Sequence, residues 1–175
     1  VAGAFDRLAS VFGKLHVPVV VGNHGRSTIK WRAKGRATDS FEWLFAHNIA
    51  DHHFKGSKAV TFDIPESYDT NVRVYKHRLH LEHGDNFKGG AGIAGAMSPL
   101  LLGVHRTTRQ AISEERMFQN AHVPQELHVT ERMFDVMALG HWHQYLVAPS
   151  KGLIINGSLK GYDEYAYVSN FESEP

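Results

Sequence analysis

The chain contains an apolar run that leads directly into two closely spaced histidines. Val136-Met137-Ala138-Leu139 predicts a short buried strand, and Gly140-His141-Trp142-His143 follows it without a break. If the backbone stays extended, His141 and His143 point to the same side of it. A sheet edge that presents two imidazoles in this way can bind one metal ion or a close pair of ions. Two solvated histidines at a strand end are the simpler interpretation of this motif on its own.

The composition limits which metal sites and which classes of protein are possible. The 175 residues include 13 histidines and no cysteine, so any metal site must use His, Asp, Asn or Glu, and disulfides are excluded. The 42% hydrophobic and 21% charged content is typical of a soluble globular protein. No apolar run of membrane-spanning length and no secretory signal occurs, so we expect no membrane partner and a cytoplasmic location. The net charge of +1 does not by itself indicate a nucleic-acid partner.

Helical and strand patterns alternate along the chain and predict one layered α/β domain over residues 1–175. Asp39 followed by Glu42 is typical of a helix N-terminus. A glycine-rich loop is expected over residues 84–95. Helices are expected over 2–15, 40–50 and 97–119, with a shorter one after Pro124, and strands over 17–21, 59–62, 72–81, 136–139, 153–155 and 165–168.

Two further strand ends carry residues that can bind metal. Gly22-Asn23-His24 follows the apolar run 19–21, and His83-Gly84-Asp85 follows the strand that ends near Leu81. Glycine beside a ligand permits the tight turn and the close approach that a crowded metal centre needs. Each motif alone is weak, but the three together, in this order and without thiolates, are specific.

In this set of motifs the chain resembles the calcineurin-like metallophosphoesterases. That family's signature is Asp-x-His, Gly-Asp, Gly-Asn-His, a single His and Gly-His-x-His, and its last three elements stand here as Gly22-Asn23-His24, His83 and Gly140-His141-Trp142-His143. His83-Gly84-Asp85 and Gly161-Tyr162-Asp163-Glu164-Tyr165 also resemble phage-type members, for which the location would be the host cytoplasm. The resemblance implies a layered β-sandwich flanked by helices that hydrolyses a phosphomonoester or phosphodiester.

The resemblance also implies a role for each matching residue. Asn23, His83 and His141 would bind one of two divalent metal ions, and His143 would bind the other. His24 would be the catalytic residue, which contacts the scissile phosphate and protonates or stabilises the leaving oxygen. Imidazole nitrogen and amide oxygen suit Mn, Fe or Zn better than Ca. Mn is the metal we expect, with Fe, Zn, Ni or Mg as alternatives.

Two elements of the family signature, Asp-x-His and Gly-Asp, are missing from the chain. Only 22 residues precede Asn23, and their one aspartate, Asp6, has no histidine at the required spacing. We therefore expect a domain that lacks its N-terminal strand–helix–strand portion and is also incomplete at its C-terminus. Without those carboxylate ligands to offset the charge of the metal ions, the isolated chain should be inactive or nearly so. Gly25 also stands where an acidic residue is frequent in the family.

A basic segment follows the Asn23-His24 turn. We assign Arg26, Lys30, Trp31 and Arg32 to substrate binding, because cations beside an aromatic ring can follow a phosphodiester backbone and stack on a base. This assignment favours a nucleic-acid phosphodiester as the substrate. A solvated surface loop is the alternative interpretation of the same residues.

Two other functions compete with the phosphoesterase interpretation. Residues 90–95 fit the dinucleotide-binding pattern G-x-G-x-x-G, with Glu114 and Glu115 about 20 residues further on, but the preceding strand is charged and the two glutamates fall inside a predicted helix. A loop at the rim of the phosphoesterase site explains these glycines better. The second competitor is a non-catalytic metal- or nucleic-acid-binding module that retains the fold and has lost the reaction.

Overall fold

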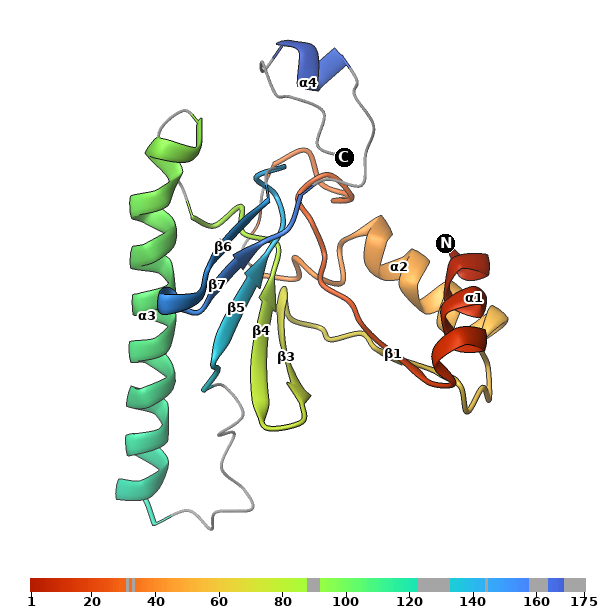
Figure 1. Cartoon of the computed structure of the whole chain (residues 1–175), viewed down its shortest axis with the longest axis horizontal. Coiled ribbons are helices and arrows are strands. Elements are labelled where there is room, and N and C mark those ends of the chain that lie inside the picture. Colours follow the sequence, from red (N-terminus) through yellow and green to blue (C-terminus); the bar gives the residue numbers. More distant parts are fainter. Residues whose placement is uncertain are drawn as a thin grey trace. The chain divides into compact units, whose positions relative to one another are not determined.

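The computed structural model describes residues 1–30, 32, 34–87, 92–122, 133–143, 145–157 and 164–168. The chain divides into two compact units, Val1–Thr70 and Asn71–Pro175, and each is described by itself. Their helices and strands are labelled in Figure 1. Both units combine helices with β-structure, so the chain is a mixed α/β protein.

The first unit contains a short parallel sheet with helices around it. Its elements are α1 (Ala2–Phe12), β1 (Leu15–Pro18), α2 (Phe41–Asn48) with a π-helical turn (Ile49–His53), and β2 (Val60–Asp63). Strands β1 and β2 pair in parallel, with Leu15 opposite Val60. Ile49, Phe54 and Val60 form the core, and Phe5 of α1 contacts the ring of Phe62 with centroids 5.8 Å apart. Phe5 and Ala9 of α1 thus pack on this core, whereas Leu8 and Phe12, which share the predicted apolar face, are exposed.

Three sequence expectations for this unit are corrected. Helix α1 ends at Phe12 because Gly13 adopts a positive φ of 80°, a conformation that commonly terminates a helix. Strand β1 consequently begins at Leu15 and ends at Pro18, so the expected strand over 17–21 is wrong beyond Pro18. Helix α2 is confirmed, but its N-cap is Ser40 rather than Asp39, since the Ser40 hydroxyl accepts a 3.2 Å hydrogen bond from the Glu42 N–H.

The second unit is built on a five-stranded mixed sheet. Its elements are β3 (Asp69–Val74), β4 (His77–Glu82), α3 (Gly92–Asn120), β5 (Val136–Leu139), β6 (Leu146–Ala148), a 3-10 turn (Pro149–Lys151), β7 (Leu153–Ile155) and α4 (Glu164–Val168). The strand order is β3-β4-β5-β7-β6. β4 pairs with β5 and β5 with β7 in parallel, whereas β6 pairs with β7 in antiparallel fashion. The three central strands therefore end at the same edge of the sheet.

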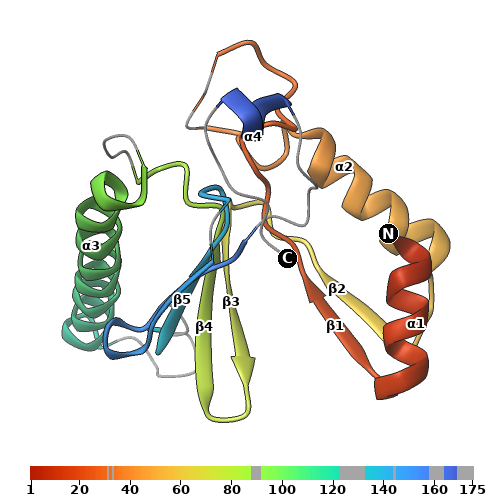
Figure 2. The ribbon, with the colours of Figure 1, turned by 45° about the horizontal axis from the view of Figure 1, so that its top comes forward.

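Helix α3 covers the sheet of the second unit, and Figures 1 and 2 show the two side by side. Leu100 of α3 packs in a buried cluster with residues of β5 and β7, namely Met137, Leu139, Leu153 and Ile155. Met137 and Leu153 have no exposed surface. The apolar run that predicted strand 136–139 is therefore the centre of this core. Among the described helices, none combines the length and the apolar content needed to cross a membrane.

Further sequence expectations are corrected in this unit. The single strand expected over 72–81 is a hairpin of β3 and β4, because Tyr75 takes a positive φ of 55° and reverses the chain. The strand expected over 165–168 is helix α4, in agreement with the helix-forming tendency of glutamate and alanine. The loop expected over 84–95 gives way to α3 at Gly92, whereas 88–91 and the short helix expected after Pro124 lie outside the described residues. The layered calcineurin-like arrangement stays a prediction.

Candidate functional site

Two of the predicted metal ligands come together at the edge of the second unit's sheet. β4 and β5 are parallel, with Glu82 opposite Leu139, so the residues that follow them leave the sheet at the same level. The Gly140 N–H donates a 3.1 Å hydrogen bond to the His83 carbonyl, which extends the pairing by one residue. Side chains that follow neighbouring parallel strands meet at this edge, where α/β proteins commonly bind ligands. His83 and His141 are therefore brought together by the sheet.

The geometry of His83 and His141 fits a shared metal ion. Their ring centroids lie 5.0 Å apart and the ring planes are inclined by 69°. Two imidazoles whose nitrogens each lie about 2.1 Å from one cation have ring centres roughly 5 Å apart. A Cβ at Gly140 would lie 3.7 Å from Nδ1 of His83, an ordinary contact distance, so the approach of the two rings does not require glycine there. Both histidines are partly buried, which limits the number of orientations they adopt.

The His-x-His motif is not an extended segment, and this expectation is corrected. His141 and His143 have positive φ angles of 67° and 54°. The Trp142 N–H donates a 2.7 Å hydrogen bond to the Gly140 carbonyl, and the Trp142 indole packs on the core cluster of β5, β7 and α3. The motif therefore turns around a partly buried tryptophan, and the backbone bends on both sides of it. Such φ values cost of order 1–3 kcal/mol for residues other than glycine and are concentrated at functional sites.

The ligand set within the described residues is a pair of histidines rather than a complete metal centre. No three His, Asp or Glu side chains in the described part of the chain gather at one point. His143 is partly buried, and its positive φ bends the backbone. The side chains of His141 and His143 therefore do not point to the same side as they would on an extended strand. The residues that the structure describes thus fit one cation through two nitrogen donors.

A buried polar network supports the strand that carries His83, and sequence reasoning missed it. His80 and Glu82 are 4% and 7% exposed and share a face of β4, being two residues apart. Nδ1 of His80 lies 3.0 Å from Oδ1 of Asn71, and Nε2 of His80 lies 3.5 Å from Oε2 of Glu82. The Asn86 side chain donates a 2.8 Å hydrogen bond to Oε1 of Glu82, which closes the turn over His83. Polar residues at alternate positions before the histidine were the signal for this network.

In the first unit, α2 holds the turn that contains Asn23 and His24. The Gly22 N–H donates a hydrogen bond to the Glu42 carboxylate, and the Phe41 N–H donates one of 2.7 Å to the Gly25 carbonyl. Asn23 is partly buried in this turn, and His24 is exposed. Glu42 was expected only as part of a helix N-terminus, yet its carboxylate accepts the hydrogen bond from Gly22 at the start of the turn that contains both predicted functional residues.

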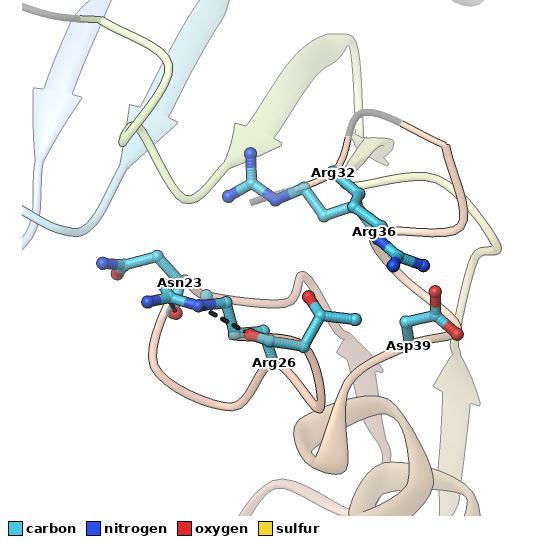
Figure 3. Close-up of a pocket in the computed structure, with 7 residues that line it drawn as sticks. Asn23, Arg26, Arg32, Arg36 and Asp39 are labelled. Carbon is cyan, nitrogen blue, oxygen red and sulfur yellow. Dashed lines mark hydrogen bonds between the residues drawn. The ribbon is translucent and has the colours of Figure 1, made fainter. Parts of the chain in front are cut away.

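A small pocket beside Asn23 is rich in arginine. It is lined by Gly22, Asn23, Arg26, Thr28, Arg32, Arg36 and Asp39. Arg26 donates hydrogen bonds to the carbonyls of Asn23 (2.8 Å) and Thr28 (3.1 Å), and Figure 3 shows Arg32 across the pocket from them. Two of the predicted substrate-binding residues, Arg26 and Arg32, are thus brought together. Lys30 is not among the lining residues, and Trp31 lies outside the described residues.

Arg36 completes the pocket and was not among the predicted substrate-binding residues. Its guanidinium lies over the ring of Tyr68, 5.3 Å from the centroid, which is a cation–π distance. Figure 3 shows Arg36 and Asp39 pointing toward one another. The sequence has cations at positions 30, 32, 34 and 36. Only the fold of the loop shows that Arg36 lines the pocket and Lys30 does not.

The chain was also compared with known proteins. No family model, curated protein or solved structure matches it. A functional proposal for this chain therefore depends on its motifs and on the geometry of the residues described above.

Proposed function

We propose that this protein is a metal-dependent phosphoesterase that hydrolyses a phosphomonoester or phosphodiester. The observation that carries the proposal is the pair His83 and His141, which follow neighbouring parallel strands with ring centroids 5.0 Å apart. Sites that bind divalent metal through imidazole need this kind of rigid, convergent placement. The positive φ angles at His141 and His143 support it, because strained backbone at residues other than glycine is concentrated at functional sites.

Each residue of the three motifs has a role in this proposal. His83 and His141 hold one divalent ion, and Asn23 and His143 keep the ligand roles that the motif resemblance implies. A bound metal ion polarises the phosphoryl oxygens and lowers the pKa of water, so that hydroxide is available near neutral pH. His24 donates a proton to the leaving oxygen as the ester P–O bond breaks and the oxygen of water bonds to phosphorus. Its exposed position leaves it accessible to a substrate.

The arginine-lined pocket supports a phosphate ester as the substrate class. Guanidinium groups bind phosphate oxygens through charge-assisted, paired hydrogen bonds. Arg26 and Arg32 lie in the same small pocket that Asn23 borders. A nucleic-acid phosphodiester is the substrate that this chemistry favours, because each nucleotide carries such a group.

Hydrolysis of bis-(p-nitrophenyl) phosphate in the presence of Mn²⁺ tests the proposal. The assay is made with the product of the whole reading frame, which includes any ligands outside this chain. We expect activity that EDTA removes and that His24→Ala or His141→Ala abolishes. The matched control is His105→Ala, an exposed histidine of α3. Activity that survives both substitutions would overturn the site assignment.

A non-catalytic binding module is the second candidate function. It is favoured by the absence of a third His, Asp or Glu beside the histidine pair within the described residues. Such a module would bind metal or nucleic acid and would not hydrolyse bis-(p-nitrophenyl) phosphate, whichever divalent metal ion is added. Metal binding at His83 and His141 without hydrolysis would decide in its favour.

A further inference from the structure

The arginine-lined pocket of the first unit has the charge to bind a phosphate group. We propose that it binds a terminal phosphate of the substrate, distinct from the ester that is cut. This inference deepens the proposed function and rests on it for the identity of the substrate, but the binding itself needs no metal. The pocket would make the protein selective for phosphorylated ends.

The charges around the pocket match a dianion better than a monoanion. Three arginines and one aspartate line it, so its lining side chains carry three positive charges and one negative charge, a net charge of +2. Arg26 contacts backbone carbonyls, which are neutral and do not offset its charge. A phosphomonoester carries a charge of about −1.5 to −2 near pH 7, whereas each internal diester carries about −1.

The pocket is held in shape before a ligand arrives. Arg26 uses two of its five N–H donors on the Asn23 and Thr28 carbonyls, which fixes the plane of its guanidinium. Arg26 and Ser40 form an antiparallel bridge, and the Ser27 N–H donates a 2.9 Å hydrogen bond to the Asp39 carbonyl. The two sides of the loop are thereby joined around the pocket. Such preorganisation raises affinity because little conformational freedom is lost on binding.

Thymidine oligonucleotides with and without a 5′-phosphate provide the test, with inorganic phosphate as a competitor and EDTA present throughout. We expect tighter binding of the phosphorylated oligonucleotide and displacement of it by inorganic phosphate. Arg32→Ala should weaken the phosphorylated complex roughly 10- to 100-fold, the usual effect of losing hydrogen bonds to a charged group. Asp39→Asn should strengthen it, because a negative charge leaves the pocket wall.

Matched variants separate this site from general electrostatic attraction. Arg7→Ala removes an exposed cation from α1, outside the pocket, and should leave the preference for the 5′-phosphate unchanged. Arg32→Lys keeps the charge but loses the planar guanidinium with its paired donors, so it should retain only part of the affinity for the phosphorylated oligonucleotide. Circular dichroism of each variant verifies that the fold is kept.

The outcomes are distinct for the two proposals. A 5′-phosphate preference that persists in His141→Ala and disappears in Arg32→Ala supports the phosphate pocket independently of the metal site. Equal losses for both oligonucleotides in Arg32→Ala, or no loss for either, would overturn it. Hydrolysis of bis-(p-nitrophenyl) phosphate, which has no second phosphate, reports on the proposed function alone.

Discussion

The side chain of Glu42 occupies the space that a side chain on Gly25 would need. A Cβ at position 25 would lie 2.5 Å from Cγ of Glu42, and the Glu42 carboxylate accepts a hydrogen bond from Gly22. The turn that carries Asn23 and His24 is thus supported by an acidic residue from α2. An acidic residue is frequent at the position of Gly25 in the family that the motifs resemble, and in this chain the carboxylate of Glu42 lies beside that glycine instead.

Replacing Gly25 by alanine should therefore destabilise the first unit. The added methyl group forces Glu42 out of place, and overpacking of this kind costs about 1–3 kcal/mol. The free energy of unfolding from urea denaturation measures the effect. Gly3→Ala in α1 is the matched control, because nothing lies within 4 Å of a Cβ there and alanine favours the helix by up to ~1 kcal/mol.

The contact between Gly25 and Glu42 can be isolated by a double-mutant cycle. Glu42→Ala removes the obstruction, so Gly25→Ala should cost less in that background than in the natural chain. Strictly additive effects of the two substitutions would show that the destabilisation has another origin.

Substitution of His143 should reveal the strain in the histidine motif. At its φ of 54° glycine is favoured over alanine by about 1–2 kcal/mol, so His143→Gly should be more stable than His143→Ala. At His105 in α3 the order should reverse, because glycine weakens a helix by about 1 kcal/mol relative to alanine. Thermal unfolding of the four variants measures both differences. The same order at both positions would argue against a left-handed backbone at His143.

Asp135 should make the second unit less stable in acid. A 2.7 Å hydrogen bond from the Arg78 backbone N–H, followed by the charge of the Arg78 guanidinium, lowers the pKa of the Asp135 carboxyl. Because its pKa is lower in the folded than in the unfolded state, its contribution is present above the ordinary aspartate pKa. That contribution is lost as the pH falls through the lowered value.

Titration of the Asp135 carboxyl carbon by NMR measures this shift. Arg78→Ala removes the guanidinium and keeps the backbone N–H, so the midpoint should rise only part of the way to the ordinary value. In Asp135→Asn the free energy of unfolding should fall less steeply as the pH is lowered than it does in the natural chain. A midpoint at the ordinary value in the natural chain would contradict the observed hydrogen bond.

The sequence predicted the elements whose pattern is local and strong. The apolar run 136–139 is a buried strand as expected, since four consecutive apolar residues need a covered sheet position. The turn between β3 and β4 was missed because Tyr75 takes a conformation typical of glycine, with no glycine or asparagine to signal it. Helix α1 was predicted too long because Gly13 ends it against an otherwise continuous helical pattern.

The residues of the candidate site could be named from the sequence, but their geometry could not. Strand-end motifs identified His83 and His141, and parallel pairing of β4 with β5 brings them together. The bend at the histidine motif depends on where the indole of Trp142 packs, which is a property of the core rather than of the motif. The hydrogen bond from Gly22, the residue before Asn23, to Glu42 also depends on tertiary structure, because the two residues lie on different segments. Such contacts leave no periodic signal in a sequence.

The central claim is that His83 and His141 bind the same metal ion, and Mn²⁺ broadening of histidine ring signals in NMR spectra tests it directly. Substoichiometric Mn²⁺ should broaden the signals of His83 and His141 well before that of the exposed His105. His83→Ala should remove the selective broadening at His141, with an affinity loss at least as large as the roughly 10–100-fold that loss of an outer-shell partner costs. His105→Ala should change neither. Uniform broadening of all histidines, or selective broadening at His141 that persists in His83→Ala, would contradict a shared site.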